Sequence, residues 1–335
     1  MKILSLLRHG SANRVFAVST IPDVSPGPGQ VRIAVEASGI NFADILARRG
    51  AYPEAPQPPC VLGFEVVGRI DALGSGVKGL ESGQRVLALT RFGGYASQVV
   101  VPASAVVPVP LAMEPGAAAA LGTQGVTAWI AAEHLVHISE GDHVLVHSAA
   151  GGVGTLLVQL ARARGAIVTG TVGSDDKFPL LERLGVTHTI NSRTHDFSRE
   201  LRQRPDVIFD AVGGSSVSRG LKSLATGGRL VSYGVATLSG EGWALPRAVR
   251  MLLGFGLVHP LSLLTRSKAL IGLNLLALSD AKPELVGQAL KEVVDLAARG
   301  TLAPIVDREF RAEDVGEAHA HVESRRSVGK VVLRW

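Results

Sequence analysis

The sequence predicts an α/β protein in which a doubly wound parallel sheet is joined to a second, mostly β domain. Three observations carry this prediction. A β-branched strand at 144–147 runs through a glycine turn into an apolar helix that ends near residue 164. Strands and helices then alternate to about residue 234, as in a parallel sheet with crossover helices. Before residue 120 the chain instead shows short strands separated by Gly and Pro turns.

The first domain is expected to be assembled from short β-strands. Hydrophobic runs bounded by turn residues predict four of them, at 31–36, 61–70, 85–89 and 96–101. An Ala-rich helical pattern from 115 to 135 then leads into the second domain. With 335 residues, the chain is long enough for two domains that each bury a core of their own.

The parallel sheet is expected to contain five strands joined through helices, at 142–147, 167–171, 188–190, 207–210 and 229–233. Beyond residue 236 a polar link leads to an apolar helical region at 245–264. A strand at 269–273 and a helix at 282–299 follow. The chain closes with an apolar strand at 329–333, which we expect to return to the first domain.

The turn after the first strand of this sheet predicts a dinucleotide site. Gly151 and Gly154 hold two of the three glycine positions of a G-x-G-x-x-G turn, and Ala149 stands at the first. Small residues leave backbone N–H groups and the start of the next helix free to face a pyrophosphate. A turn that serves only close helix packing is the structural alternative. The predicted pyrophosphate-binding residues are Ala150, Gly151, Gly152, Val153 and Gly154.

The second strand indicates which dinucleotide is bound. A ribose 2′-hydroxyl is usually held by an acidic residue about 20 positions beyond the glycines, whereas a 2′-phosphate needs cations. No carboxylate stands at the strand end, at 172–174, and Lys177 follows together with the hydroxyl of Ser174. NADPH is therefore predicted rather than NADH. Alternatively, Lys177 and its neighbours Asp175 and Asp176 form a solvated first helical turn.

Composition argues against several other classes of protein. The net charge of +5 is spread without a long basic run, so nucleic-acid binding is not expected. The single cysteine, Cys60, permits no intramolecular disulfide and no Cys-rich zinc lobe, and it fits a reducing compartment.

The apolar start at 1–7 is too short for a signal peptide. The segment 251–264 contains a proline and falls short of the roughly 20 residues of a spanning helix. A cytoplasmic protein without membrane association is expected.

Seven motifs follow one another along the chain, and they read GINFAD, GAYP, GFE, GVTAW, AAGGVG, DAVGG and VGK at 39–44, 50–53, 63–65, 125–129, 149–154, 210–214 and 328–330. Together they resemble the medium-chain dehydrogenase/reductase superfamily, and specifically its zinc-independent quinone oxidoreductase branch. The resemblance implies a GroES-like catalytic domain at 1–122 and 265–335. It places a Rossmann NADPH-binding domain at 123–264, with a cleft between the two. It also implies a homodimer formed through an edge strand such as 269–273.

The same resemblance predicts that no metal is bound. The positions of the catalytic zinc ligands in zinc-dependent alcohol dehydrogenases are held here by Asn41, Phe64 and Thr123. An amide, a phenyl ring and a hydroxyl do not supply the thiolate, imidazole or carboxylate ligands that zinc prefers. Glu65 is interpreted as a buried structural acid whose charge is satisfied by hydrogen bonds. Without a Lewis acid the acceptor must take hydride readily, which fits quinones and conjugated carbonyls.

The resemblance also implies where the reacting groups lie. Asn41 and Tyr52 are expected to flank the nicotinamide, and Thr127 to contact its carboxamide. Tyr52 is interpreted as a hydrogen-bond donor to the developing enolate or quinol oxygen. The alternative is a tyrosine that shapes or covers the site, with water as the donor. Residues after the later strands are expected to complete the cofactor site, namely Ser192, Arg193, Val212, Tyr233, Gly234 and Leu273.

Two departures from ordinary quinone reductases bear on the substrate. The sequence at 191–193 resembles the enoyl reductase domains of polyketide and fatty acid synthases. Arg193 is there either a second cation near the 2′-phosphate or an exposed loop residue. The apolar segment at about 237–268 resembles the VAT-1-like subgroup and is expected near the cleft.

Within this segment the apolar residues form one helical stripe, made of Leu245, Val249, Leu252 and Leu253, while Arg247 and Arg250 face solvent or a lipid headgroup. Core packing or a dimer contact is favoured over membrane association. A wide, apolar substrate entrance is the functional interpretation.

The sequence therefore predicts an NADPH-dependent, zinc-independent reductase. Its hydride is expected to go to a small apolar acceptor, which is a quinone, an enone or an enoyl thioester. One alternative is an enoyl reductase that acts on a carrier-linked or CoA-linked acyl chain in a biosynthetic pathway. The other is an NADPH-binding partner protein or membrane-associated protein with little turnover.

Overall fold

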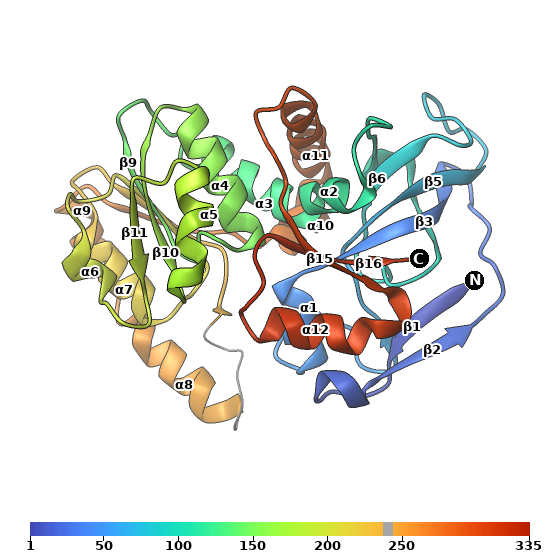
Figure 1. The fold of residues 1–335 in the computed structure, drawn as a ribbon, viewed down its shortest axis with the longest axis horizontal. Helices are drawn as coiled ribbons and strands as arrows, with labels where there is room; N and C mark the ends of the chain where they lie inside the picture. Colours follow the sequence, from blue (N-terminus) through green and yellow to red (C-terminus); the bar gives the residue numbers. More distant parts are fainter. Residues whose placement is uncertain (237–243) are drawn as a thin grey trace. The chain divides into compact units, whose positions relative to one another are not determined.

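The computed structural model describes residues 1–236 and 244–335, and the chain divides into two compact units (Figure 1). Unit 1 contains Met1–Val126, Leu276–Gly300 and Pro304–Trp335, and unit 2 contains Thr127–Leu275 with Thr301–Ala303. The first boundary lies close to the one expected after residue 122. The second is a correction, because unit 2 continues past residue 264. The strand at Ala269–Gly272 pairs with the sheet of unit 2 and holds this part of the chain there.

Unit 2 is built on a parallel sheet of six strands, which are β9 (His143–Val146), β10 (Ile167–Val172), β11 (His188–Asn191), β12 (Val207–Asp210), β13 (Arg229–Ser232) and β14 (Ala269–Gly272). Their spatial order is β11-β10-β9-β12-β13-β14, and every neighbouring pair is parallel. The order reverses between β9 and β12, as in the Rossmann fold, where ligands bind outside the carboxyl ends of the strands at this switch point. The predicted doubly wound sheet is confirmed.

The helices of unit 2 connect these strands and cover the sheet. They are α4 (Gly152–Ala163), α5 (Phe178–Arg183), α6 (Phe197–Glu200), α7 (Ser215–Ser223), α8 (Ala244–Phe255) and α9 (Pro260–Leu264), with a 3₁₀ turn η5 (Asp175–Lys177). Helix α4 packs on β9 and β10. It buries Leu156, Leu157 and Leu160 against a strand whose Leu145 and Val146 are fully buried. This apolar contact fixes the start of α4 directly beyond the end of β9.

Unit 1 is mostly β. Its strands are β1 (Lys2–Leu6), β2 (Phe16–Thr20), β3 (Gln30–Ile40), β4 (Cys60–Val61), β5 (Glu65–Leu73), β6 (Arg85–Leu89), β7 (Gln98–Pro102), β8 (Val106–Pro108), β15 (Val306–Arg311) and β16 (Lys330–Arg334). One sheet has the order β2-β1-β4 and the other β15-β16-β3-β5-β6-β8, with β7 also paired to β3. Strand β16 runs antiparallel to β3, so the predicted return of the carboxyl-terminal strand to the first domain is confirmed.

The helices of unit 1 are short except for one. They are α1 (Phe42–Arg48), α2 (Pro115–Ala120), α10 (Leu275–Ala281), α11 (Pro283–Ala298) and α12 (Val315–Glu323), with 3₁₀ turns η1 (Ala12–Arg14), η2 (Ala103–Ala105) and η7 (Ala312–Asp314).

The helical stretch predicted at 115–135 is present but irregular. After α2 it continues as the π-helical η3 (Leu121–Gly125), α3 (Val126–Trp129) and the π-helical η4 (Ile130–Leu135). Gly122 departs from helical geometry, with a ψ of −117°. A Cβ at this position would lie 2.8 Å from the Cβ and the Cγ of Glu65. The helix is therefore distorted where it passes the buried side chain of Glu65.

The apolar segment expected at 237–268 is only partly described. Residues 237–243 and the side chains of Leu245, Arg247 and Arg250 lie outside the described residues. The expected single helical region is two helices, because Gly256, with a φ of +67°, and the proline at the start of α9 separate α8 from α9. Val249, Leu252 and Leu253 are 47%, 64% and 77% exposed, so core packing is wrong for these three side chains.

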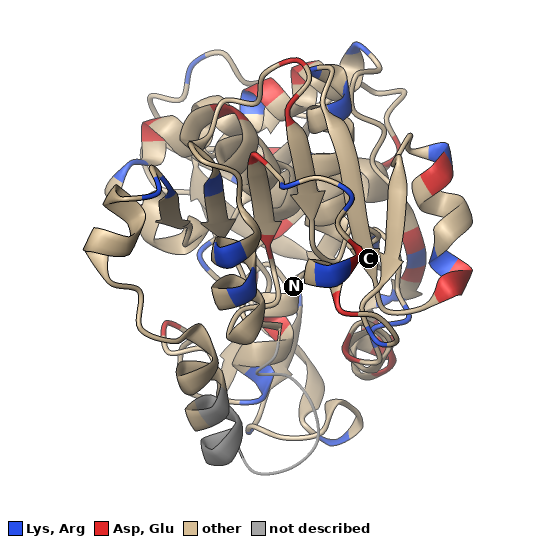
Figure 2. Ribbon diagram, turned by 90° about the vertical axis from the view of Figure 1, so that its left-hand side faces the viewer, with Lys and Arg blue, Asp and Glu red and all other residues tan. Residues whose placement is uncertain are grey.

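Charged residues are mixed along the chain. Figure 2 shows Lys and Arg interspersed with Asp and Glu on the side in view. Throughout residues 1–236 and 244–335, every helix is too short or too polar to cross a membrane.

Candidate functional site

The turn between β9 and α4 leaves no room for a side chain at its last glycine. A Cβ added to Gly154 would lie 2.8 Å from the Cα of Ala149 and against the carbonyl oxygen of Ser148. Ser148 is left-handed, with a φ of +55°, and its carbonyl accepts the N–H of Gly151 at 2.8 Å. Gly151 is the N-cap of α4. The first amides of this 12-residue helix lack helical acceptors and are available to an anion.

Ala149 replaces the first glycine of the motif, and the neighbouring strand explains why this is tolerated. Ala149 is fully buried, and its N–H donates to the carbonyl of Thr171 in β10 at 2.9 Å. A Cβ added to Gly170 would approach the Cβ of Ala149 to 3.0 Å. The small residue in β10 therefore provides the space that the methyl group of Ala149 occupies.

The predicted cofactor residues of unit 2 follow the carboxyl ends of all six strands. These ends lie along one edge because the strands are parallel. The residues are Ala150, Gly151, Gly152, Val153 and Gly154 after β9, Ser174 and Lys177 after β10, Ser192 and Arg193 after β11, Val212 after β12, Tyr233 and Gly234 after β13, and Leu273 after β14. Segments far apart in the sequence are thus brought to a single edge. Thr127 lies outside this set, on α3, where its side chain is buried.

The end of β10 carries the residues predicted to read the 2′-phosphate. Lys177 is only 8% exposed, so it is not part of a fully solvated turn, whereas Asp175 and Asp176 are exposed. The side chain of Arg193 lies along Gly173, where an added Cβ would be 3.4 Å from its Nε. The carboxylate of Asp175 accepts a hydrogen bond from the side-chain amide of Asn191 at 2.7 Å. A basic residue from the next strand end therefore reaches the backbone beside Ser174.

Asp210, at the end of β12, organises the turn that carries Val212. Its Oδ1 accepts the N–H groups of Val212 and Gly213 at 2.8 and 2.7 Å, and the hydroxyl of Ser216 donates to Oδ2. His147, at the end of β9, lies with Nε2 3.9 Å from Oδ2 of Asp210. Burial lowers the pKa of His147, with Asp210 opposing the shift, so the ring is neutral at pH 7. The ends of β9 and β12 are joined by the backbone N–H of His147, which donates to the carbonyl of Phe209 at 3.0 Å.

In unit 1, polar side chains converge on the carboxylate of Glu65. Asn41 donates through Nδ2 to both carboxylate oxygens, at 2.9 and 2.8 Å, and the Thr123 hydroxyl donates to Oε2. Lys330 pairs with Oε1 and donates to Oδ1 of Asn41 at 2.8 Å. Glu65 and Lys330 are both fully buried. The interpretation of Glu65 as a buried acid satisfied by hydrogen bonds is confirmed. We call these four side chains the Glu65 cluster.

The Glu65 cluster contains Asn41 and Thr123, two of the three residues that the sequence resemblance aligns with the catalytic zinc ligands of alcohol dehydrogenases. Asn41 and Thr123 both direct their side chains at Glu65, and Lys330 adds a fixed positive charge. Because Lys330 already neutralises the charge of Glu65, the cluster offers a divalent cation no uncompensated carboxylate. Among the side chains that the structure describes, no group of His, Cys, Asp and Glu is arranged to hold a metal ion.

Asp44 fixes the backbone of Asn41. Its Oδ2 accepts the N–H of Asn41 at 2.8 Å and its Oδ1 accepts the N–H of Gly63 at 3.0 Å. Asn41 is the N-cap of α1, and Asp44 completes a capping box with it. Burial raises the pKa of Asp44 to about 7, against the two backbone donors, and the charge of Glu65 adds to the rise. The position of Asn41 therefore depends on a buried carboxyl group.

Tyr52 is half-buried beside the ring of Phe64, and the ring centroids are 6.2 Å apart in an edge-to-face arrangement. Burial, and then the charges of Glu54 and Asp44, raise the pKa of Tyr52 to about 12. Its hydroxyl is therefore protonated at pH 7 and able to donate a hydrogen bond. Phe64 immediately precedes Glu65, so Tyr52 packs next to the strand that carries the Glu65 cluster.

Lys330, Asp210 and His147 are absent from the site residues predicted from the sequence. Lys330 could have been suspected from the sequence, because it begins an apolar strand. A lysine that is buried with such a strand needs a buried partner of opposite charge. Its partner Glu65 is distant in the sequence, and only the pairing of β16 with β3 brings the two together. The signal for Asp210 was its place at the carboxyl end of a strand and just before two glycines.

Comparison with known proteins defines the family. Residues 27–111 match the alcohol dehydrogenase GroES-like domain, and residues 184–333 match a domain described as zinc-binding dehydrogenase. The synaptic vesicle membrane protein VAT-1 homolog is 34% identical to this chain in Danio rerio, over 310 residues, and in Rattus norvegicus, over 314 residues. The alignments cover 91% and 92% of this chain, but 64% and 78% of those proteins. The chain thus spans less than two thirds of the Danio rerio relative.

Comparison with solved structures points to the same family. Escherichia coli quinone oxidoreductase complexed with NADPH matches with a TM-score of 0.87 at 28% identity, over 100% of both chains. The CurK enoyl reductase matches with a TM-score of 0.84 at 26% identity, over 99% of each chain. The chain belongs to the medium-chain dehydrogenase/reductase superfamily of oxidoreductases, in its zinc-independent quinone oxidoreductase and VAT-1-like branch.

Proposed function

We propose that this protein is an NADPH-dependent, zinc-independent reductase that transfers hydride to a quinone or to an activated C=C bond. One observation carries the proposal: Asn41 and Thr123, which the sequence resemblance aligns with zinc-ligand positions, both donate hydrogen bonds to Glu65. Glu65 is itself paired with the buried ammonium group of Lys330. A chain that keeps the dinucleotide turn but carries an amide and a hydroxyl in place of zinc ligands is suited to acceptors that need no Lewis acid.

The residues of unit 2 fit a dinucleotide. The tight approach of Gly154 to Ser148 and Ala149 leaves the start of α4 open, and its amides would hold the pyrophosphate. When bound, NADPH supplies the hydride, and a proton from the protein or from water completes the reduction. Val212 is held by Asp210 at the same edge of the sheet and would contribute to binding the nicotinamide half.

Basic residues after β10 and β11 favour NADPH over NADH. Lys177 and Arg193 would pair with the 2′-phosphate, and Ser174 would donate a hydrogen bond to it. Asp175 is hydrogen-bonded to Asn191, which leaves it less free to bind a ribose hydroxyl. The complex of the Escherichia coli relative with NADPH supports the same preference.

Unit 1 would act as the catalytic part. Asn41 is held by Glu65 through its side chain and by Asp44 through its backbone, so it would present a fixed surface to the nicotinamide. Thr127 would contact the carboxamide of the same ring. Tyr52, protonated at pH 7, would donate a hydrogen bond to the oxygen on which negative charge develops.

A second candidate is an enoyl reductase that acts on a carrier-linked or CoA-linked acyl chain. Two similarities favour it: the match to the CurK enoyl reductase, and the match of 92% of this chain to a segment of a Mycobacterium tuberculosis mycocerosic acid synthase-like polyketide synthase at 32% identity. Both candidates share the reaction, which is hydride addition to a conjugated C=C bond or quinone, and they differ in the acceptor.

The test is the oxidation of NADPH by the purified full chain, with benzoquinones, naphthoquinones, short enones and enoyl thioesters as acceptors. The proposal expects rapid turnover and a reduced product from at least one acceptor. The winning class separates quinone reduction from enoyl reduction. Tight NADPH binding without turnover on any acceptor would contradict the proposal and favour a partner protein.

Tyr52→Phe tests the donor. If Tyr52 donates to the developing oxygen, kcat falls by about 10²-fold or more while the KM for NADPH stays constant. If Tyr52 only shapes the site, the phenylalanine variant keeps kcat, because it retains the ring that packs on Phe64.

We also infer a homodimer that forms through β14. This strand is the last in the order of the parallel sheet, and within the described chain it pairs only with β13. Its open edge offers unpaired backbone groups to a second copy. Light scattering on the purified chain is expected to give twice the mass of 34.9 kDa, and a monomer would contradict the inference.

A further inference from the structure

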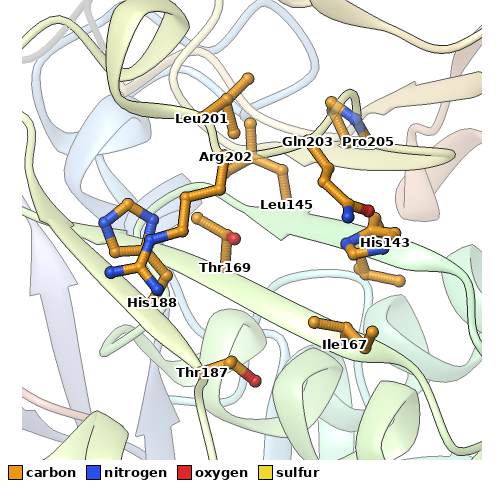
Figure 3. Close-up of a pocket in the computed structure, with 11 residues that line it drawn as sticks. His143, Leu145, Ile167, Thr169, Thr187, His188, Leu201, Arg202, Gln203 and Pro205 are labelled. Atoms are coloured by element: carbon orange, nitrogen blue, oxygen red, sulfur yellow. The ribbon is translucent and has the colours of Figure 1, made fainter.

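A cavity of about 150 Å³ lies in unit 2 at the amino ends of its strands. It is lined by the first residues of three strands, His143, Ile167 and His188, and by the loop 201–205 that leads to β12. The residues predicted to bind the dinucleotide follow the carboxyl ends of the same strands. The cavity is therefore at the other edge of the sheet and is separate from the proposed coenzyme site. Figure 3 shows Arg202 extending from the loop toward His188.

The polar groups around the cavity include donors that the fold leaves unused. Arg202 and Gln203 are exposed, and their side chains are not hydrogen-bonded or ion-paired to any residue of the described chain, so both are open to a ligand from solvent. The Nδ1 of His188 is buried and has no hydrogen-bond partner among residues 1–236 and 244–335. A buried polar atom without a partner costs free energy, which a ligand would recover.

The charge at the cavity is a single permanent cation. Arg202 is the only Lys or Arg in its lining, and no Asp or Glu belongs to that lining. Burial, and then Arg202, lower the pKa of His188, against the charge of Glu200, so this ring is neutral at pH 7. Asp206, which follows the lining residue Pro205, accepts the backbone N–H of His143 at 2.9 Å. The cavity therefore offers one positive charge with neutral donors beside it.

The rest of the lining contains His143, Thr169 and Thr187 together with an apolar part that includes Leu145, Ile167 and Leu201. The volume is well above the roughly 10–15 Å³ that a cavity needs to hold one water molecule, so a ligand of several non-hydrogen atoms fits. A bare inorganic anion would leave the apolar walls without contact. A dianion would exceed the one charge that Arg202 supplies.

We propose that this cavity binds a small monocarboxylate, whose carboxylate faces Arg202 and His188 and whose short hydrocarbon part lies against Leu145 and Leu201. Guanidinium and carboxylate groups match in geometry and form charge-assisted hydrogen bonds. This site does not depend on the proposed reductase activity, and its ligand is not the hydride acceptor.

Isothermal titration of the full chain at pH 7 tests the proposal, with benzoate as the probe and benzamide and inorganic phosphate as comparisons. Benzoate is expected to bind saturably at millimolar concentration and more tightly than either comparison. Arg202→Gln is expected to weaken benzoate binding by about tenfold or more, the loss expected for one charge-assisted hydrogen bond. Arg199→Gln is the matched control, because it removes an exposed arginine of α6 that does not line the cavity.

A second variant separates the two donors. His188→Phe keeps a ring of similar shape but removes both nitrogens, and it is expected to weaken benzoate binding several-fold while Arg202 stays in place. Circular dichroism of each variant checks that the fold is kept. Equal binding of benzamide and benzoate, tighter binding of phosphate, no saturable binding of benzoate, or equal effects of the Arg202 and Arg199 variants would each overturn the proposal.

Discussion

Lys330 and Glu65 are a charged pair without access to water. Burial of two charges is costly, and the cost is recovered only when the pair is in contact and its other polar atoms are satisfied. Here Asn41 and Thr123 supply the additional hydrogen bonds. The pair thereby immobilises the side-chain amide of Asn41, which is bonded to both members.

Lys330→Met removes one charge and leaves Glu65 buried without its cation. The free energy of unfolding is expected to fall by about 3–5 kcal/mol, as for other broken buried pairs. Urea unfolding at pH 7 measures it. The double variant Glu65→Gln with Lys330→Met is expected to lose less than the single variant, because no uncompensated charge remains. A loss below about 1 kcal/mol in the single variant would contradict this account of the Glu65 cluster.

Lys177→Met tests the contact with the 2′-phosphate. The dissociation constant for NADPH is expected to rise by about tenfold or more, because one charge-assisted hydrogen bond is lost. The constant for NADH, which has no 2′-phosphate, is expected to stay unchanged. Fluorescence titration with both coenzymes measures the two constants. Lys222→Met is the matched control, since Lys222 is an exposed lysine of α7 in the same unit. Equal changes for NADPH and NADH would refute the contact.

Asp44 makes the free energy of unfolding depend on pH, and the sign of this dependence follows from its pKa. Its pKa rises from 3.8 to about 7 on folding, so the folded protein binds this proton more tightly than the unfolded chain does. The contribution of Asp44 to the free energy of unfolding therefore decreases as pH rises from about 4 to about 7, by up to about 4 kcal/mol. Burial lowers the pKa of His147 and of His319. Their contribution to the free energy of unfolding therefore has the opposite pH dependence, and it decreases as the pH falls below about 6.5.

Asp44→Asn isolates the effect of this carboxyl group, because the histidines remain. Urea unfolding of both proteins between about pH 5 and pH 8 is expected to show the wild-type protein losing stability relative to the variant as the pH rises. A difference between the two proteins that does not change with pH would show that Asp44 is ionised in the folded state.

At the level of elements, the turn from β9 into α4 uses its two glycines for different purposes. An added Cβ at Gly154 meets the backbone of Ala149 and Ser148, whereas at Gly151 it meets only the Ser148 carbonyl oxygen, at 3.2 Å. Gly154 is therefore required by the packing of the helix on the strand. Gly151 leaves the backbone open on its outer side, where a pyrophosphate would approach.

Gly154→Ala and Gly151→Ala are expected to separate these purposes. The Gly154 variant should lose stability without any ligand, by about 1–3 kcal/mol, because the turn must shift. The Gly151 variant should keep most of its stability but bind NADPH more weakly. Thermal unfolding and coenzyme titration of the two variants measure the effects. A stable Gly154 variant with normal NADPH binding would contradict the geometry of this turn.

Elements with strong apolar patterns were predictable from the sequence. The strands of the parallel sheet and the long helix α11 follow the expected ranges within a few residues. Strands β1 and β2 were not predicted, since the apolar run at the start of the chain is short and ends in charged residues. The breaks in the helical stretch 115–135 also escaped prediction. The distortion at Gly122 lies against Glu65, a residue of another segment, which no local pattern reveals.

At the scale of the whole molecule, the chain builds unit 1 from both of its ends. The pairing of β16 with β3 joins residues 331–334 to residues 37–40, and it brings the adjacent Lys330 to Asn41. The return of the strand was predictable from its apolar pattern, but the partner of its lysine was not. The glycine turn could be recognised from sequence because its residues are adjacent, whereas the Glu65 cluster is drawn from four separate segments.

The measurement that tests the central claim most directly is the ratio of kcat/KM for NADPH to that for NADH, with the best acceptor and with protein dialysed against a strong chelator. The account predicts undiminished turnover after dialysis and a ratio of at least about ten in favour of NADPH, from the 2′-phosphate contacts. Activity that disappears with the chelator and returns with zinc, or equal use of both coenzymes, would contradict it.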